Sequence, residues 1–212
     1  MRPANISLKS ECYPLMRDKV GNFLVYFCQG KEIPLSAALK LLYLLDETSV
    51  RESGVPITFL DYYVYERGPV AHDVYYIAKI EEKKIPLDDT IKLSSFIEVS
   101  KMPETENSKS HYIIKPKKKF DELECSEYEL EILEKVVKKY GDKSANRLSK
   151  LTHEKNSLWD KARIANNLDE YFKLNNCKHS DVPVHFIPLM KTASKKRAYQ
   201  NAKLSLDCIS EF

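Results

Sequence analysis

The sequence predicts a mainly α-helical fold with a small β-hairpin, an α+β protein built as a single compact helical domain. Three observations lead to this prediction. Glycine and proline are sparse, with 5 and 10 among 212 residues, which favours helices over a many-turned β architecture. Residues 36–46 are apolar on almost every face, as a helix at the centre of a core would be. One stretch, about 90–116, changes to the alternation typical of half-buried strands.

The N-terminal part predicts two helices. The first covers about 15–28 and ends at Gly30, and the second covers 36–46. Lys40 is the only charged residue of the second helix before Asp46, so we expect the helix to be buried. From Asp46 onward the chain is expected to return towards water.

A strand or a helix fits residues 57–65, which are aromatic and β-branched. Gly68 then permits a sharp backbone angle, and Pro69 suits the first position of a helix, where its missing N–H needs no partner. Asp73 lies where the positive end of the helix dipole favours an anion. We therefore expect a helix from Pro69 to about Lys83.

A hairpin is expected next. Four apolar residues alternate with polar ones, interrupted at 95–96: Ile91, Leu93, Ile97 and Val99. Residues 111–115 form the partner strand, and the polar stretch 100–110 forms a long loop between them.

Three further helices are expected at about 126–140, 145–151 and 157–165. Ser126 and Glu129 have the spacing of a capping box, in which each side chain binds the other residue's backbone N–H. Ser157 and Asp160 repeat that spacing, and Gly141 suits a helix end.

The last part of the chain differs in charge. The net charge is +3, but residues 171–212 carry +4 and residues 1–170 carry −1. We expect a helical domain over 1–175 and a basic C-terminal extension over 176–212, with a short helix at about 191–208. A near-neutral body with a mildly basic tail is weak evidence for nucleic-acid binding.

Several kinds of chemistry have no motif here. The five glycines are never closer than nine residues, so the chain has no phosphate-binding glycine loop, dinucleotide fingerprint or nucleophile elbow. The best metal candidates, Cys177, His179, His185 and Cys208, lack a recognised spacing. The longest uncharged run has 11 residues, short of a membrane span. We expect a cytoplasmic protein without catalytic, cofactor-binding or metal residues.

Two alternatives remain open at this level. The basic segments 115–119 and 195–197 would serve a nucleic-acid-binding regulator, although such runs are more often solvated surface. His153, next to Glu154, would serve as the general base of a hydrolase or transferase. No nucleophile accompanies it in sequence, so a helix-end histidine bonded to backbone is the stronger interpretation.

Tyrosines gather on both sides of Gly68 and Pro69. Tyrosine offers a large apolar area with a polar tip, which suits protein–protein contacts. Four of them are candidate partner-binding residues: Tyr62, Tyr65, Tyr75 and Tyr76. Tyr63 belongs to the same cluster.

Three stretches taken together carry a resemblance to a known family. They are Lys40-Leu41-Leu42-Tyr43-Leu44-Leu45-Asp46, then Tyr65 to Val70 with Val74-Tyr75, then Leu148-Ser149 and Leu151-Thr152-His153 with Trp159 downstream. In this order they resemble the SocA-like antitoxins, which share the Panacea domain and include the phage-associated GepA-like proteins. Glu66 and Arg67 separate Tyr65 from Gly68, which are adjacent in the family's pattern.

The resemblance implies a mostly helical bacterial domain with a small β element and a non-enzymatic role. A member neutralises a cognate protein toxin, either by binding it directly or as an adaptor to an ATP-dependent protease; self-association stays open. The motif residues with an implied structural role are Leu42, Tyr43, Asp46, Gly68, Pro69, Val70, Thr152, His153 and Trp159.

Overall fold

The computed structural model describes residues 13–85, 92–106 and 109–209. Its α-helices are α1 (Tyr13–Cys28), α2 (Leu35–Glu52), α3 (His72–Glu82), α4 (Glu127–Tyr140), α5 (Ala145–Thr152), α6 (Leu158–Ala165), α7 (Leu168–Leu174) and α8 (Ala193–Ile209). Its strands are β1 (Ile33–Pro34), β2 (Tyr62–Tyr65), β3 (Gly68–Ala71), β4 (Ile97–Met102), β5 (His111–Pro116) and β6 (His179–Pro183). Two single 3₁₀ turns, Glu122–Glu124 and Ile187–Leu189, complete the described structure. The prediction of a mainly helical α+β fold is confirmed.

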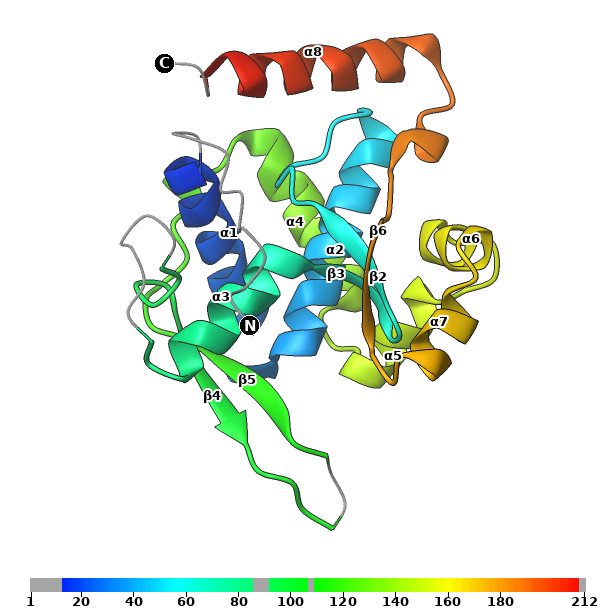
Figure 1. The fold of residues 1–212 in the computed structure, drawn as a ribbon. Helices are drawn as coiled ribbons and strands as arrows, with labels where there is room; N and C mark the ends of the chain where they lie inside the picture. The colour runs from blue at the N-terminus through cyan, green and yellow to red at the C-terminus, as the bar shows by residue number, and fades with distance from the viewer. Residues whose placement is uncertain (1–12, 86–91, 107–108, 210–212) are drawn as a thin grey trace.

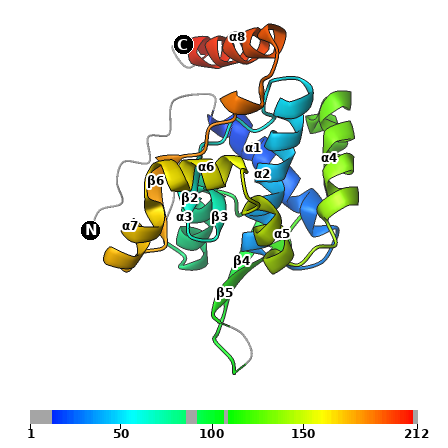
Figure 2. The same cartoon turned by 90° about the vertical axis from the view of Figure 1, so that its right-hand side faces the viewer.

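Helix α2 runs through the middle of the molecule, with α1 and α4 beside it (Figures 1 and 2). Its residues from Leu35 to Leu45 are buried except for Ser36, as the almost uniformly apolar sequence predicted. The helix is longer than predicted and ends at Glu52. The expected return towards water at Asp46 is wrong, because this carboxylate is completely buried.

Two three-stranded antiparallel sheets flank α2, in the orders β1-β5-β4 and β3-β2-β6. The β4–β5 hairpin confirms the predicted β element, and it projects from the body in Figure 1. Its first strand begins at Ile97, later than predicted, and Ile91 lies outside the described residues. Strands β1 and β6 were not predicted from the sequence.

The expected helix start at Pro69 is wrong. Residues 68–71 form β3, which pairs antiparallel with β2, and α3 begins at His72. Glu66 and Arg67 form the two-residue turn of this hairpin, so Tyr65 lies directly opposite Gly68. Pro69 is tolerated because β3 is an edge strand, where a missing N–H costs no pairing. Asp73 lies in the first turn of α3, as predicted.

The predicted caps of the later helices are present. Ser126 and Glu129 form a complete capping box at α4, and Gly141 follows its last residue. The box predicted at Ser157 is only half formed: the Ser157 hydroxyl accepts the backbone N–H of Asp160 and so caps α6, but the Asp160 carboxylate accepts the N–H of Asn156 instead of that of Ser157. Helix α7 was not predicted as a separate element.

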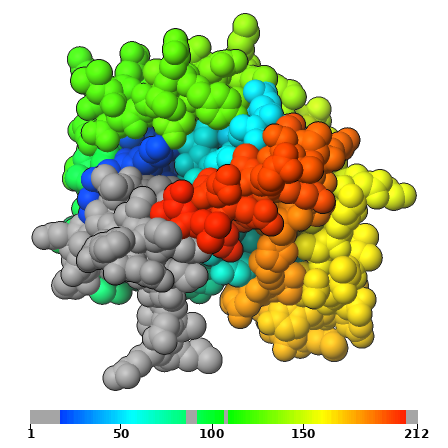
Figure 3. Space-filling view, turned by 90° about the horizontal axis from the view of Figure 1, so that it is seen from above, coloured from blue at the N-terminus to red at the C-terminus, as the bar shows by residue number. Residues whose placement is uncertain are grey.

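The segment after residue 175 packs on the body. Strand β6 pairs with β2, and the Ser180 hydroxyl donates to the Val64 carbonyl at 2.7 Å. Helix α8 then lies across one face as an exposed ridge (Figure 3). It rests on the turn after α2, where a side chain on Gly54 would meet the Lys195 backbone.

Candidate functional site

Three stretches far apart in the sequence meet at Gly68. The buried Lys40 amine of α2 donates a hydrogen bond to the Pro69 carbonyl at 2.7 Å. A Cβ on Gly68 would lie 2.8 Å from Lys40 Nζ, 2.8 Å from Thr152 Oγ1 and 3.0 Å from His153 Nε2. Gly68 itself has φ +103°, a conformation open to glycine and costly for other residues. We call Lys40, Gly68, Pro69, Thr152 and His153 the Gly68 junction.

The Lys40 amine is an unusual buried group. The side chain is 4% exposed, and no ion pair within the described residues involves it. Burial lowers the pKa of Lys40 to about 7, because the charged ammonium loses its hydration. Its role here is to hold β3 against α2 through the Pro69 carbonyl.

His153 follows α5 as its C-terminal cap and lies flat against Trp159, with ring centroids 4.2 Å apart and an angle of 13° between planes. Burial, and then the nearby charge of Lys40, lower the pKa of His153. Its Nε2 is buried without a hydrogen-bond partner in the described structure. Trp159 Nε1 in turn donates to the Tyr65 carbonyl at 2.9 Å, which fastens α6 to β2.

Asp46 lies farther along α2 than Lys40 and binds the segment before β2. Its Oδ1 accepts the backbone N–H groups of Ile57 and Thr58, both at 2.8 Å. Its Oδ2 accepts the hydroxyls of Thr58 and Tyr62, the latter at 2.8 Å. Burial raises the pKa of Asp46 to about 6, although these hydrogen bonds act in the opposite direction. The carboxylate fixes the segment that leads into β2.

Tyr62 therefore has a structural role. Its side chain is 2% exposed, binds Asp46 and packs its ring against Tyr43 and Phe186. The prediction that Tyr62 contacts a partner is wrong for this reason. Leu42, Tyr43 and Val70 are buried in the same core.

The other four tyrosines near Gly68 belong to a partly exposed aromatic cluster. Six rings from β2, α3 and β6, which we call the aromatic surface, belong to it: Tyr63, Tyr65, His72, Tyr75, Tyr76 and His179. Tyr65 is central, with its hydroxyl 3.1 Å from His72 Nδ1 and its ring centroid 6.0 Å from that of Tyr75. His72 stacks on Tyr76 at 4.3 Å.

The structure thus brings together Tyr65, Tyr75 and Tyr76 from the predicted set. His72 and His179 were not predicted to lie here. The alternation along β2 explains the division, because Tyr62 and Val64 point inward while Tyr63 and Tyr65 are partly exposed. This period-two signal was available in the sequence once the segment was known to be a strand.

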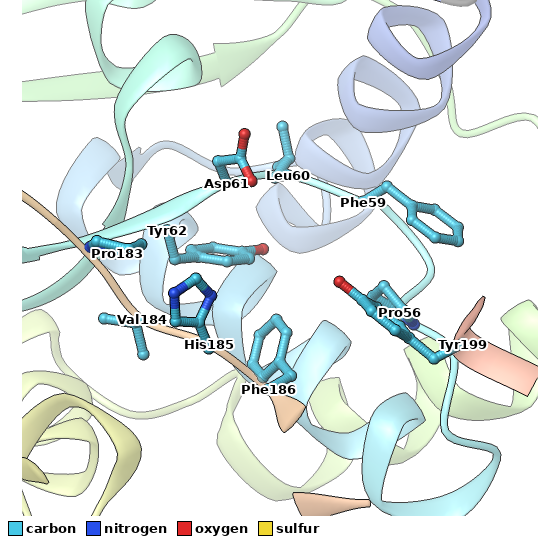
Figure 4. A pocket seen from close by; sticks show the side chains of 10 residues that line it. All are labelled: Pro56, Phe59, Leu60, Asp61, Tyr62, Pro183, Val184, His185, Phe186 and Tyr199. Atoms are coloured by element: carbon cyan, nitrogen blue, oxygen red, sulfur yellow. The ribbon is translucent and has the colours of Figure 1, made fainter. Parts of the chain in front are cut away.

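A small pocket lies beside Tyr62, between the segment before β2, the chain after β6 and α8 (Figure 4). Phe59, Phe186 and Tyr199 form much of its wall. Its volume of about 70 Å³ is well below the roughly 300–1,000 Å³ of ordinary ligand sites. The pocket is therefore too small for an ordinary ligand.

The metal candidates do not form a site in the part of the chain that the structure describes. No group of three metal-binding side chains occurs there. Cys177 Sγ lies 3.5 Å from the His179 carbonyl, whereas the Cys208 side chain is outside the description.

None of the helices among the described residues combines the length and the apolar composition that crossing a membrane requires.

The basic segments are partly occupied within the chain. Lys115 pairs with Glu32, Lys118 lies 3.7 Å above the ring of Phe96, and Lys195 donates to the Arg51 carbonyl. Segment 195–197 lies in α8, whereas segment 115–119 begins at the body end of β5, so the two basic segments belong to separate parts of the molecule (Figures 1 and 2).

A known protein family matches the part of the chain that contains these residues. The family described as Antitoxin SocA-like, Panacea domain, matches residues 39–160. The chain belongs to this family. The Panacea match runs from α2 to Asp160 in α6 and contains the Gly68 junction, the Asp46 network and β2, β3 and α3. No curated protein and no solved structure shows significant similarity to the chain.

Proposed function

We propose that this chain is an antitoxin that neutralises a protein toxin by direct contact through the aromatic surface. The observation that carries the proposal is the gathering of six rings on one surface: five partly exposed rings on β2 and α3, which lie within the Panacea match, and the exposed ring of His179 on β6, which follows it. Tyrosine is enriched at the centre of protein interfaces because it buries a large area at little entropic cost.

The elements beneath the aromatic surface support a rigid contact. β2 is fixed from below by Asp46 through Tyr62 and from the side by Trp159 through the Tyr65 carbonyl. Burial raises the pKa of Tyr63, Tyr65 and Tyr75, so their hydroxyls stay protonated at neutral pH. A surface ordered before binding loses less conformational entropy when the partner arrives.

We propose a binding protein in preference to an enzyme that uses His153 as its general base. That ring is stacked on Trp159, and its Nε2 is enclosed by the junction and faces Gly68. A general base must reach a proton on its substrate. The packing around His153 suits a structural role better than proton transfer.

Co-expression with the product of the adjacent reading frame tests the proposal. We expect the wild-type chain to restore growth and to co-purify with that product. Tyr75→Ala is expected to weaken both while the domain stays folded, whereas Tyr128→Ala, an exposed tyrosine on α4, is the matched control. Full rescue and co-purification by a folded Tyr65→Ala/Tyr75→Ala variant would show that the contact lies elsewhere.

The same cells distinguish direct neutralisation from delivery to an ATP-dependent protease. Direct binding predicts growth rescue with an unchanged amount of toxin. An adaptor predicts that the toxin disappears over time, and that deleting the protease removes the rescue. Following toxin levels after translation is stopped decides between the two routes.

A further inference from the structure

Carboxylates border one end of the aromatic surface. Asp61 precedes β2, Asp73 lies in the first turn of α3, and Asp181 lies on β6. The register of β2 and β6 places Asp181 beside the aromatic surface, because Tyr63 pairs with Pro183 and Tyr65 pairs with His179, and residues 179, 181 and 183 share the exposed face of β6. After burial, the charges of all three carboxylates raise the pKa of Tyr63. None takes part in an ion pair with another described residue.

The other end of the aromatic surface already holds a cation from the chain itself. The Lys79 amine lies 5.0 Å from the ring centroid of Tyr75 and 5.8 Å from that of Tyr76. Both distances fall within the range of cation–π attraction. Within the described residues, no cation lies over the rings of Tyr63, Tyr65 or His72.

The local charge around those three rings is negative. Burial, as the largest effect, lowers the pKa of His72, so its imidazole is neutral at pH 7. Negative ring faces and carboxylates together attract a positive group. An anionic partner such as a nucleic acid or an acidic membrane surface would be repelled at the same place.

We propose that the partner protein inserts an arginine side chain between the rings of Tyr63 and His72 and the carboxylates of Asp61, Asp73 and Asp181. Arginine fits better than lysine because its planar guanidinium stacks on a ring while its N–H groups bind a carboxylate in pairs. This inference rests on the proposed function and specifies the partner's chemistry.

A charge-reversed variant tests the proposal. Asp61→Lys/Asp181→Lys changes two exposed carboxylates and leaves Asp73, which lies in the helix, in place. Glu131→Lys/Asp142→Lys is the control, with the same change of net charge at two exposed positions, one on α4 and one in the turn after it. We expect toxin affinity to fall at least about tenfold in the first variant and by much less in the control.

Binding of an arginine peptide, measured by NMR, tests the site without the toxin. An acetylated peptide of alternating arginine and glycine is titrated into the wild-type chain at low salt, and the aromatic ring signals are followed by NMR. We expect shifts at Tyr63, Tyr65 and His72. The neutral citrulline peptide of the same length is expected to produce none, and the charge-reversed variant is expected to lose the response.

The outcomes separate this inference from the proposed function. Rescue of growth by the charge-reversed variant, with no ring shifts from the arginine peptide, would overturn the inference and leave the antitoxin role intact. Ring shifts at the aromatic surface, with no rescue of growth by the wild-type chain, would support the arginine site and count against the antitoxin role. Equal shifts from the citrulline peptide would overturn the charge argument.

Discussion

Replacing Gly68 by alanine tests the Gly68 junction directly. A non-glycine residue at φ +103° stores about 1–3 kcal/mol of backbone strain. The new methyl would also lie within 3.0 Å of Lys40 Nζ, Thr152 Oγ1 and His153 Nε2, and overpacking a filled space costs about 1–3 kcal/mol. We therefore expect Gly68→Ala to lower the free energy of unfolding by about 4 kcal/mol.

The control for this change is Gly30→Ala. Gly30 also has a positive φ, +78°, but a Cβ there would meet nothing within 4 Å. Its expected cost is the backbone strain alone, about 1–2 kcal/mol. At about 2–4 °C per kcal/mol, Tm falls by roughly 8–16 °C for Gly68→Ala and by roughly 2–8 °C for Gly30→Ala.

Thermal melting followed by far-UV circular dichroism measures both variants, and urea denaturation gives the free energies. A Gly68→Ala variant that melts like Gly30→Ala would show that the three polar groups do not close around Gly68 as described. The larger Gly68→Val is expected to fail more severely for the same reason.

Three further predictions concern the residues around the junction. Asp46→Ala leaves two buried backbone N–H groups without their acceptor, so we expect the free energy of unfolding to fall by about 3 kcal/mol or more in urea denaturation. Lys40 has a folded-state pKa of about 7, below its unfolded value, so stability of the wild type should rise between pH 7 and about pH 10. Lys40→Met should lack this rise, and parallel slopes for the two proteins would contradict the burial argument. Trp159→Phe removes the hydrogen bond to the Tyr65 carbonyl, and we expect a loss of about 1 kcal/mol by chemical denaturation with unchanged far-UV dichroism.

The sequence predicted the elements whose signals are local. The apolar run of α2, the capping box at Ser126 and the alternation that leads into β4 are each contained within a few neighbouring residues. Strand β6 was missed because its partner in β2 lies more than 100 residues earlier, and Tyr63 pairs with Pro183. No local pattern encodes such a pairing.

The site was predictable to a lesser degree. Charge alone suggested that Asp46 faces water, but its four donors, which satisfy a buried carboxylate, come from residues 57–62. Lys40 stood out as the only charge of its helix before Asp46, yet its acceptor is a backbone carbonyl 29 residues away. Strand alternation separated Tyr62 from Tyr65, but only the pairing of β2 with β3 and β6 shows which face is covered.

Because the Gly68 junction is buried, a relative that keeps it can differ at the surface. Lys40, Gly68 and Thr152 pack together inside the protein, out of reach of a partner. These motif residues therefore stabilise the scaffold. The rings of the aromatic surface and the carboxylates beside it lie outside the Gly68 junction, so they can change without destabilising it. Two proteins that share these buried residues can therefore present different surfaces, so family membership alone does not specify the binding partner.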